Sequence, residues 1–360
     1  MIGRGADIIG RGADIIGKMA TFPPIQQRLT LPGFRIGHGS DPAVPTGVTV
    51  ILCPEGARAA ADVHGSATGT RQFDSLVLGH HVATRAHAVV LSGGSGFGLA
   101  AADPVVAWLA GHGHGFATGL APVPLVPTAI LFDPSVASPL PGRHAELARQ
   151  ALEQANDPER RREEVAVGSI GAGTGATVGK AAGVERAMKG GFGFAATTVP
   201  GGPTVAAAVA VNAFGDVRDL SGRPVAGCRV APGSRELADA ATLLAHLPPE
   251  QAHPWEGNTT LAVVMTDAAL PKTSLHKVCR MAMGGLYRTL APALSLYDGD
   301  LVVTLALGDR PAHVNQVGVL AERVVAEAIL TAVRTADGLG LLPGLGDPGV
   351  SGPAAPASPT

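Results

Sequence analysis

Hydrophobic residues along the chain form short continuous runs that alternate with longer segments in which apolar positions recur every three or four residues. The short runs are rich in Val, Ile, Leu and Ala and are bounded by Gly, Pro, Asn or Asp, which is typical of buried strands. The longer segments have one apolar face, as amphipathic helices do; Val317, Leu320, Ala321, Val324 and Ala328 form such a face. The pattern predicts an α/β protein.

The expected elements alternate along most of the chain. The strands share a high apolar content and are expected at 47–53, 56–63, 86–91, 123–132, 190–199, 204–212, 261–265 and 301–307, with the first two forming a hairpin. The helices share a periodic apolar face and are expected at about 97–110, 144–155, 272–290 and 314–333. Strands that are apolar throughout need cover on both faces, so the pattern predicts stacked sheets between helical layers, an α/β sandwich.

Composition narrows the possible classes of protein. The chain has 360 residues, of which 46% are hydrophobic and 16% charged, which is enough for a large core in one or two domains. Its formal net charge is −2, it has two Trp and two Tyr, and no basic stripe runs along it, so a nucleic-acid partner is not expected. No apolar stretch approaches the roughly 20 residues that cross a membrane, so no membrane partner is expected either.

Cysteine and histidine usage indicates neither disulfides nor a metal site. Cys53, Cys228 and Cys279 are odd in number and far apart, and no pair has metal-ligand spacing, so a reduced, cytoplasmic setting is expected. Cys279 shares a helical apolar stripe with Leu275 and Leu286 and is interpreted as a core residue. The 12 histidines form no ligand constellation.

Both ends of the chain are expected to lie outside the folded domain. The segment Ile2–Ile8 is repeated at Ile9–Ile15, and two copies are too few for a solenoid. The same region lacks the continuous apolar stretch of a signal peptide. Residues 344–360 are rich in Pro, Gly, Ala and Ser. Residues 1–20 and 344–360 are therefore interpreted as disordered segments.

The first candidate for chemistry is the junction Asn258-Thr259, where a polar, Pro-marked loop ends and the apolar run 261–265 begins. A threonine hydroxyl at the start of a core strand can attack the preceding carbonyl, shift the peptide bond to an ester and let water release the upstream piece. The new terminal threonine carries a free α-amine beside its hydroxyl, which is one form of activated nucleophile. Taken alone, these residues also fit an ordinary Thr-rich strand start.

Four further polar residues stand at the ends of apolar strands, where polarity is costly. Asn212 ends one strand, and a side-chain amide there can stabilise an oxyanion. Lys189 precedes another strand, and its cation can stabilise negative charge or lower the pKa of a neighbouring amine. Asp298 and Asp300 precede a third strand and can orient an amine. Each of the four also has a plain interpretation as a turn or strand-end residue.

Two glycine-rich segments imitate known motifs. Gly93-Gly94-Ser95-Gly96-Phe97 lacks the second glycine of a nucleophile elbow and is interpreted as a tight strand-to-helix turn. The segment 171–180 ends in Gly179-Lys180 like a phosphate loop, but Thr174 replaces the first glycine and Ala181 replaces the hydroxyl that binds magnesium. Nucleotide binding is therefore not predicted, and no cofactor is expected.

A series of motifs occurs in one order from about Leu31 to Leu341. These motifs are Leu31–His38, Thr46–Val50, Asp62–Gly65, Gly69–Arg71, Leu91–Asp103, Gly171–Lys180, Met188–Gly191, Val211–Ala213, Gly257–Leu261, Thr266–Leu270 and Asp298–Asp300. In this combination the chain resembles the L-aminopeptidase D-amidase/esterase family, which contains DmpA-type aminopeptidases, β-peptidyl aminopeptidases and nylon-oligomer endo-hydrolases. So many ordered matches are far more specific than any single motif.

The resemblance implies a four-layer αββα fold of the N-terminal-nucleophile-like type, shared with ornithine acetyltransferases. It also implies that the precursor cuts itself between Asn258 and Thr259. One domain would then consist of an α piece, residues 21–258, and a β piece, residues 259–343. Thr259 matches the nucleophile of the family and needs no cofactor.

The other site residues follow from the same resemblance. Lys189 and Asn212 match the polar neighbours of the nucleophile, and Asp298 and Asp300 match acidic positions near the new amine. The aspartate pair and the Asn-Thr cut bring the chain closer to the nylon-oligomer hydrolases than to members with Ser and Glu at these two positions. Some members have at position 132 a tyrosine that hydrogen-bonds near the oxyanion. Phe132 has no hydroxyl, which makes it a candidate pocket residue with a bearing on substrate preference.

The activity implied is that of an aminopeptidase or amidase that acts on small peptides, amides or esters through an acyl-enzyme. A homotetramer of self-cleaved αβ units is the assembly that the family suggests. Two other reactions stay open, endo-hydrolysis of nylon-type oligoamides and acyl transfer like that of ornithine acetyltransferases. A non-enzymatic scaffold protein is a further alternative, and it would remain one intact chain.

Overall fold

The computed structural model describes residues 22–160, 164–246, 248 and 257–349. The predicted N-terminal extension, residues 1–20, lies outside these ranges, as do residues 350–360 of the predicted tail and most of the loop before Asn258. Residues 344–349, assigned to the tail from sequence, are hydrogen-bonded to the chain before them. The Gly346 N–H, for example, donates to the carbonyl of Ala336 at 2.8 Å.

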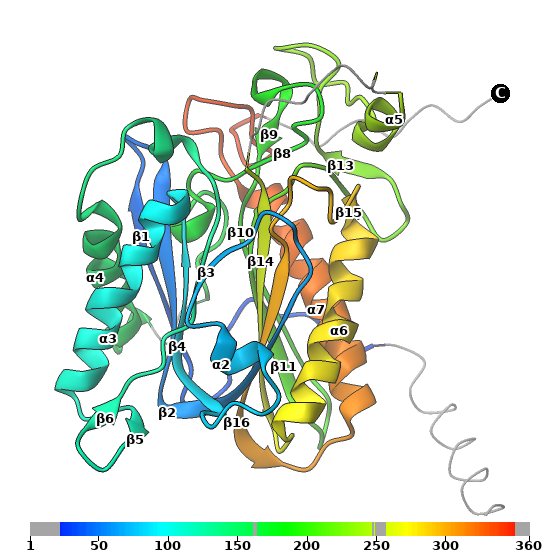
Figure 1. Ribbon diagram of the computed structural model, residues 1–360. Helices are drawn as coiled ribbons and strands as arrows, with labels where there is room; N and C mark the ends of the chain where they lie inside the picture. Colours follow the sequence, from blue (N-terminus) through cyan, green and yellow to red (C-terminus); the bar gives the residue numbers. More distant parts are fainter. Residues whose placement is uncertain (1–21, 161–163, 247, 249–256, 350–360) are drawn as a thin grey trace, which may run out of the picture.

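The described residues form a mixed α/β structure around a nine-stranded sheet (Figure 1). Its strands run in the order β10-β11-β14-β16-β2-β4-β7-β3, and β1 pairs with β2 outside this path. These strands are β1 (Arg35–Asp41), β2 (Thr46–Val63), β3 (Gly69–Arg71), β4 (Arg85–Ser92), β7 (Thr128–Ile130), β10 (Gly191–Thr198), β11 (Thr204–Asn212), β14 (Thr259–Ala268) and β16 (Leu301–Arg310).

Helices and small strand pairs complete the described part of the chain. The helices are α2 (Asp74–Val77), α3 (Ala102–Gly111), α4 (Arg143–Asn156), α5 (Ala240–Ala245), α6 (Lys272–Thr289) and α7 (Val314–Thr335). The short strands are β5 (Phe116–Ala117), β6 (Pro122–Val123), β8 (Thr177–Val178), β9 (Met188–Lys189), β12 (Asp216–Arg218), β13 (Pro224–Ala226) and β15 (Leu290–Ala291). None of the described helices is long and apolar enough to cross a membrane.

The predicted hairpin of 47–53 and 56–63 is wrong, because both segments belong to the single strand β2. Gly56 takes a positive φ of 81°, and the pairing of β2 with β4 shifts register between Leu52 and Ala57. The polar interruption Pro54-Glu55-Gly56 therefore makes a bulge and a bend instead of a chain reversal. This bend lets one strand pair with β1 and β4 at its start and with β16 near its end.

Most other predicted elements are confirmed within a few residues, with two informative differences. The strand expected at 123–132 is reduced to β7, because Pro124 and Pro127 have no N–H to give to a ladder. The helix expected from residue 97 starts as a 3-10 turn, Ser95–Ala101, before α3 begins. Gly94 precedes this turn with a φ of 79°, so the Gly-rich segment is a tight strand-to-helix turn as predicted.

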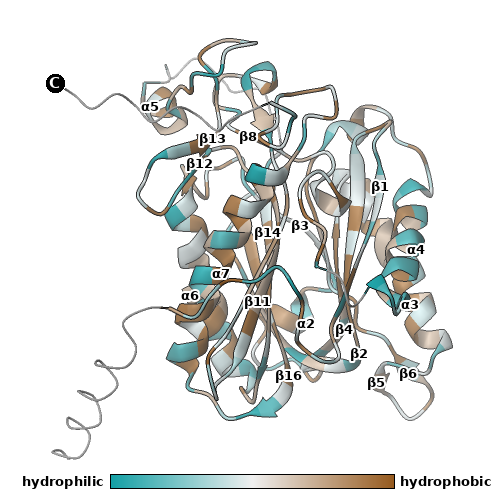
Figure 2. Cartoon of the chain, turned by 180° about the vertical axis from the view of Figure 1, so that it is seen from behind, coloured by the Kyte–Doolittle hydropathy of each residue, from teal (hydrophilic) through white to brown (hydrophobic). Residues whose placement is uncertain are grey.

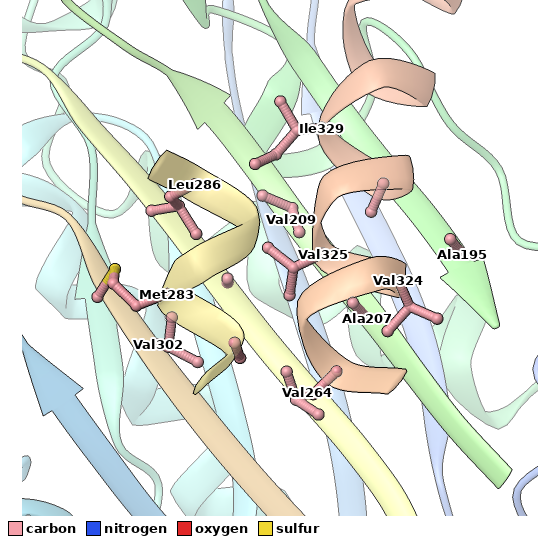
Figure 3. Packing of buried hydrophobic residues seen from close by; sticks show 14 of the residues in the cluster. Ala195, Ala207, Val209, Val264, Met283, Leu286, Val302, Val324, Val325 and Ile329 are labelled. Carbon is pink, nitrogen blue, oxygen red and sulfur yellow. The ribbon is translucent and has the colours of Figure 1, made fainter. Parts of the chain in front are cut away.

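Of the four buried clusters of apolar side chains in the described residues, three pack on the main sheet. In the first, α6 and α7 pack on the sheet, and Figure 3 shows Leu286 of α6 and Val325 and Ile329 of α7 beside the strand residues Val209 and Val264. In Figure 2 the two helices carry bands of teal and brown, as expected of helices that are apolar on one side only. Cys279 lies in this cluster, so its predicted core role is confirmed.

The second cluster lies among the strands themselves, and the third lies between β2 and β4 and the helices α3 and α4. The second contains Leu91 of β4 together with Phe192 of β10 and Leu261 of β14, so it joins the two ends of the sheet through their inner faces. The third places α3 and α4 against β2 and β4, with Val50 and Leu147 among its members. Figure 1 shows the resulting arrangement, with α3 and α4 on one side of the strands and α6 and α7 on the other.

Candidate active site

Thr259 is the first residue of β14, a strand in the middle of the sheet. β14 pairs antiparallel with β11 on one side and parallel with β16 on the other. The register places Thr259 directly opposite Asn212, the last residue of β11. The Thr259 side chain is buried, at 3% exposure, and Asn212 is fully buried. Two of the residues predicted from sequence are therefore brought together by strand pairing alone.

The carbonyl of Asn258 is contacted by two donors. The Thr259 hydroxyl donates to its oxygen in a very short contact, and the backbone N–H of Gly299 donates to the same oxygen at 2.8 Å. The Asn258 N–H donates in turn to the carbonyl of Tyr297 at 3.1 Å. The turn 297–299 thus binds residue 258 through both its backbone N–H and its carbonyl oxygen. A donor fixed on a carbonyl oxygen is what stabilises the oxyanion when that carbonyl is attacked.

Gly299 has no side chain at a point where one would not fit. A Cβ built on this residue would lie 2.6 Å from the Thr259 Oγ and 2.8 Å from the carbonyl oxygen of Ala67. Both separations are shorter than real Cβ contacts. The absence of a Cβ therefore lets the Gly299 backbone and the Thr259 hydroxyl approach the Asn258 carbonyl together.

The Asn212 side chain has a fixed orientation. Its Oδ1 accepts hydrogen bonds from the backbone N–H of Thr177 and from the Lys180 Nζ, both at 3.0 Å. A backbone N–H and an ammonium can only donate, so the amide oxygen must face them. The Nδ2 then donates to the carbonyl of Phe132 at 2.9 Å and lies 3.5 Å from the carbonyl oxygen of Gly257. The donor side of this amide is therefore turned toward the chain just upstream of Thr259.

Lys180 is a site residue that the sequence analysis missed. Its side chain is buried, and its Nζ lies 3.4 Å from the backbone carbonyl oxygen of Asn212 in addition to the contact with Oδ1. Its positive charge also favours the ionised form of Asp298. The signal was present, since Lys180 follows a glycine-rich turn within one of the family motifs. The same Gly179-Lys180 pair also matches an incomplete phosphate loop, which hides its role in the site.

Lys189 lies on β9, which pairs with β8, the strand that contains Thr177. Its backbone pairs with Thr177, the residue whose N–H bonds to Asn212, but its Nζ donates to the carbonyl of Thr174. Burial lowers the pKa of Lys189 to about 8, against smaller opposite effects of Asp337 and Asp133. Within the described residues its ammonium has no hydrogen bond or ion pair with the other predicted site residues. The structure does not bring Lys189 onto the nucleophile.

Asp298 lies beside the residue that precedes Thr259. Asn258 and Asp298 form an isolated parallel bridge, so their backbones run side by side. One carboxylate oxygen of Asp298 accepts from the Phe214 N–H at 3.0 Å, and the other accepts from the N–H and hydroxyl of Ser295 at 3.1 and 2.5 Å. Burial raises the pKa of Asp298, while these donors and Lys180 oppose the rise.

Asp300 lies beside the residue that follows Thr259. Its Oδ1 accepts from the N–H of Thr260 at 2.6 Å, and its Oδ2 lies 3.4 Å from the N–H of Leu294. Burial raises the pKa of Asp300 to about 7, and the neighbouring charge of Asp298 adds to the rise. The backbone of Asp298 and the carboxyl group of Asp300 thus lie beside the residues before and after Thr259. A positive charge created there would favour their ionised forms.

The arrangement can carry out attack by a hydroxyl on a carbonyl, with donors for the developing oxyanion and acidic groups next to the nitrogen that leaves. In the described part of the chain, no group of three or more His, Cys, Asp or Glu side chains is placed to hold a metal ion. The geometry assembles Thr259, Asn212, Asp298 and Asp300, and it adds Lys180 and the Gly299 N–H to them.

Comparison with known proteins decides the family. The model of the family described as Peptidase family S58 matches residues 29–342, which is most of the chain. The chain belongs to peptidase family S58. The resemblance noted from the ordered motifs is thereby confirmed, and the protein is a peptide-bond hydrolase.

Relatives in and around this family carry related names. The S58 chain is 35% identical to an uncharacterized aminopeptidase of Mycobacterium leprae (strain TN) over 352 residues, which covers 89% of the chain and 93% of the relative. It is 29% identical to the 6-aminohexanoate-oligomer endohydrolase of Paenarthrobacter ureafaciens over 322 residues, 85% of each protein.

Solved structures agree on the fold. The L-aminopeptidase D-Ala-esterase/amidase of Ochrobactrum anthropi, described as a prototype for the serine aminopeptidases and a variant of the Ntn hydrolase fold, superposes with a TM-score of 0.60. The match covers 85% of each chain at 17% identity. A likeness at this identity shows the fold of the S58 chain and leaves its chemistry to be argued from its own residues.

Proposed function

We propose that the S58 chain cuts itself between Asn258 and Thr259 and then works as an N-terminal-threonine aminopeptidase or amidase. The observation that carries this proposal is the contact of the Thr259 hydroxyl with the Asn258 carbonyl, on whose oxygen the Gly299 N–H also lies. The nucleophile, its target and a donor for the oxyanion are thus in one place before any bond changes.

The cut proceeds in two steps. The Thr259 Oγ attacks the carbonyl carbon of Asn258 and loses its proton, the C–N bond breaks, and the nitrogen of Thr259 takes up a proton. The peptide bond has then become an ester between Asn258 and Thr259. Water hydrolyses this ester, which leaves a carboxylate on Asn258 and restores the hydroxyl of Thr259. The Gly299 N–H stabilises the oxyanion of the attack.

Turnover uses the same hydroxyl on a second carbonyl. A free α-amine titrates at roughly 7.7–8.0 when unperturbed, so the new amine of Thr259 is substantially neutral near that pH and accepts the hydroxyl proton. The acyl-enzyme forms as the leaving amine or alcohol departs with a proton, and water then releases the acid. These steps use only groups of the protein and water.

Asn212 supplies an oxyanion donor during turnover. In the continuous chain its Nδ2 faces the carbonyls of Phe132 and Gly257. Once the cut frees the end of the upstream fragment, Gly257 can move away from this amide, and one N–H of Asn212 then serves the oxyanion of a substrate opposite Thr259. Lys180 holds the amide in this orientation through Oδ1, so we assign a positioning role to Lys180, in addition to the charge stabilisation expected of Lys189 from sequence. Removal of one such donor costs roughly 3–4 kcal/mol of transition-state stabilisation in other enzymes.

Asp298 and Asp300 orient the new amine. They lie next to residues 258 and 260 in space, and burial raises both pKa values, for Asp298 against the opposing charge of Lys180. The cut creates an ammonium at Thr259 when the amine is protonated, and this charge favours the two carboxylates. The pair in turn holds the amine beside its own hydroxyl.

Small peptides, amides and esters are the proposed substrates. The relative from Mycobacterium leprae carries the name aminopeptidase, which supports removal of amino-terminal residues. The relative from Paenarthrobacter ureafaciens is named a 6-aminohexanoate-oligomer endohydrolase, which supports endo-hydrolysis of nylon-type oligoamides as a second candidate. Both reactions pass through the same acyl-enzyme.

The finer fold and assembly belong to the same proposal. Helices on two sides of strands whose inner faces share one apolar cluster fit a four-layer αββα sandwich. A homotetramer of cut αβ units in the cytoplasm is the form in which we expect the enzyme to work. Native mass spectrometry of the purified protein tests the stoichiometry.

Denaturing mass spectrometry with amino-terminal sequencing tests the cut. Wild-type protein should yield two fragments, one ending at Asn258 and one beginning with Thr259. Thr259→Ala should remain whole. Thr260→Ala is the matched control, because it removes a buried threonine hydroxyl one residue later, and it should still be cut. A wild-type chain that stays intact after long incubation at neutral pH would sink the proposal.

A further inference from the structure

The chain enters the site past Phe132 at a point too narrow for a side chain. A Cβ built on Gly257 would lie 2.7 Å from the Cβ of Phe132, 3.0 Å from its Cγ and 3.1 Å from its Cδ2. Gly257 does not have a positive φ, so its backbone conformation suits any residue. Lack of space beside Phe132 is therefore the reason for a glycine at this position.

Phe132 cannot move aside easily, because its backbone is held on both sides. Its carbonyl accepts from the Asn212 Nδ2 at 2.9 Å. The side chain of the next residue, Asp133, accepts from the Thr46 hydroxyl at 2.6 Å and from the Gly94 N–H at 3.1 Å. Rotation of the ring would relieve the contacts with Cγ and Cδ2 but would leave the Cβ of Phe132 where it is. The obstacle therefore includes an atom that no rotamer removes.

Residue 258 marks where an acyl residue lies relative to the nucleophile. Its N–H and its carbonyl are bonded to Tyr297 and Gly299, and its carbonyl faces the Thr259 hydroxyl. Thr259 sits on a central strand paired on both sides, so its hydroxyl attacks from a fixed place. A substrate carbonyl must come to the same place in order to react.

We propose that the acyl residue of a substrate takes the position of Asn258, and that Phe132 restricts the next position upstream to a group without a Cβ branch. This inference rests on the proposed function and names its substrate class. A residue with a free amine has nothing at the upstream position and is accepted. Glycine and an unbranched methylene chain are accepted as well. A peptide with an L-side chain at that position is rejected, so a peptide bond is attacked only after the amino-terminal residue or after a residue that glycine precedes.

Both candidate reactions meet this one steric requirement. An aminopeptidase substrate ends at the acyl residue, and an oligoamide of unbranched methylene units carries no side branch at any position. Phe132 would thus admit removal of an amino-terminal residue and endo-hydrolysis of a linear oligoamide while excluding endo-hydrolysis of proteins. A tight but local steric conflict costs typically about 1–3 kcal/mol, or roughly five- to 150-fold in rate.

Three p-nitroanilides test the proposal on the cut enzyme. They are Asn-p-nitroanilide, acetyl-Gly-Asn-p-nitroanilide and acetyl-Ala-Asn-p-nitroanilide. All three have the acyl residue of the precursor, asparagine, and the last two have an acetylated amino terminus. Wild type should prefer the glycine compound over the alanine compound by about tenfold or more in kcat/KM. Phe132→Gly should reduce this ratio to within about threefold, and Phe132→Ala, which retains the Cβ, should reduce it less. Phe97→Gly removes an exposed ring elsewhere and should leave the ratio unchanged.

Self-cleavage gives an independent measurement of the same contact. Gly257→Ala should lengthen the half-time of the cut about tenfold or more, and Phe132→Gly in the same chain should restore it to within about threefold of Phe132→Gly alone. A Gly257→Ala precursor that is cut at the wild-type rate, or a double variant no faster than Gly257→Ala, would contradict the contact.

The outcomes separate this inference from the proposed function. If the cut enzyme hydrolyses none of the three compounds, the proposed function is contradicted, and the self-cleavage rates still decide the role of Phe132. If Asn-p-nitroanilide is hydrolysed and the two acetylated compounds react equally well in wild type, the steric role is overturned while the function stands. If both acetylated compounds are inert in wild type and in Phe132→Gly, substrates do not follow the path of the precursor, which also overturns the inference.

Discussion

Two buried lysines, Lys180 and Lys189, have different hydrogen-bond partners. The Lys180 ammonium bonds to the Asn212 side chain, which stands opposite Thr259. The Lys189 ammonium bonds to the carbonyl of Thr174. Sequence position alone made Lys189 the better candidate, since it precedes an apolar strand. The contacts favour Lys180, because its ammonium binds the side chain of the residue that stands opposite Thr259, whereas the hydrogen bond of Lys189 goes to a backbone carbonyl elsewhere.

Replacement of each lysine by methionine compares the two roles. Lys180→Met should lower kcat/KM of the cut enzyme about 100-fold, because the Asn212 amide loses the donor that fixes its orientation. Lys189→Met should change kcat/KM less than about tenfold and affect mainly the free energy of unfolding, because it leaves the Thr174 carbonyl without its donor. The measurements are kcat/KM, the rate of self-cleavage and urea denaturation of each variant. The reverse order of the two kinetic effects would restore Lys189 as the functional lysine.

Asp300 should make the continuous chain less stable as the pH rises. Its pKa is raised from an ordinary 3.8 to about 7, so between these values the folded chain binds a proton that the unfolded chain has lost. The free energy of unfolding therefore falls as the pH rises through this window. In an uncut Thr259→Ala background, Asp300→Asn should remove part of this fall, because asparagine stays neutral.

Urea denaturation from pH 4.5 to 7.5 measures this contribution. The difference between the Thr259→Ala chain and its Asp300→Asn derivative should change steadily across the range, in favour of the derivative at the higher pH. Asp219→Asn serves as a control, since Asp219 lies half-buried on a turn and its pKa is lowered, not raised. Parallel curves for the two chains with and without Asp300 would show that this carboxyl group does not titrate in the window.

At the scale of elements, the turn 297–299 and strand β14 form one unit around residue 258. The turn supplies the Tyr297 carbonyl and the Gly299 N–H, and the strand supplies the Thr259 hydroxyl. Neither part alone aligns the peptide bond with its attacker. The parallel pairing of β14 with β16 keeps the two together, because β16 begins directly after this turn at Leu301.

Gly299→Ala should therefore slow self-cleavage about tenfold or more without unfolding the protein. The new Cβ would compete with the Thr259 hydroxyl for the same space and push it away from the Asn258 carbonyl. Mass spectrometry over time gives the rate of cutting, and circular dichroism checks the fold. Gly111→Ala is the control, since a Cβ there meets nothing within 4 Å. Wild-type cutting by Gly299→Ala would contradict the close approach described for this turn.

At the scale of the whole molecule, the proposed cut severs the chain inside its main sheet. β14 and β16 belong to the downstream fragment, whereas β11 and β2, which flank this pair of strands, belong to the upstream fragment. α7 of the downstream fragment also shares the apolar cluster of β10 and β11. Separation of the fragments would expose unpaired strand edges and this cluster to water.

The two fragments should therefore stay together after the cut. Size-exclusion chromatography of the cut protein should give the same elution volume as uncut Thr259→Ala, while a denaturing gel of the same fraction shows two bands for the former and one for the latter. Urea should release the fragments only in the range where the sheet unfolds. Elution of either fragment alone from native buffer would mean that the strand pairing does not survive the cut.

Sequence reasoning succeeded where local pattern is enough. Continuous apolar runs predicted β10, β11, β14 and β16, and periodic apolar faces predicted α4, α6 and α7 within a few residues. It failed where a local signal has two meanings. The interruption at Pro54-Glu55-Gly56 is a turn signal by composition, yet its neighbours on both sides find partners in one sheet, so the strand continues through a bulge.

The candidate site shows the same division. Thr259, Asn212, Asp298 and Asp300 could be chosen from the sequence because each breaks an apolar pattern at a strand end, and the ordered motifs identified the family that contains them. Lys180 could not be chosen in this way, because nothing along the chain says which buried polar group its ammonium meets. The close approach of Gly257 to Phe132 cannot be read from the sequence either, because the two residues are separated by 124 intervening positions.

The sequence by itself determined the class of the fold, the family and the residue that we propose as nucleophile. The fold class follows from periodicity, which acts over a few neighbouring positions, whereas the family and the nucleophile follow from the resemblance of the ordered motifs. The tertiary structure alone decided which lysine supports Asn212, which backbone N–H lies on the Asn258 carbonyl and which side chain limits the space upstream of it. Such contacts join residues far apart in the chain, and their distances are set by how the whole sheet packs and bends, which no local pattern encodes.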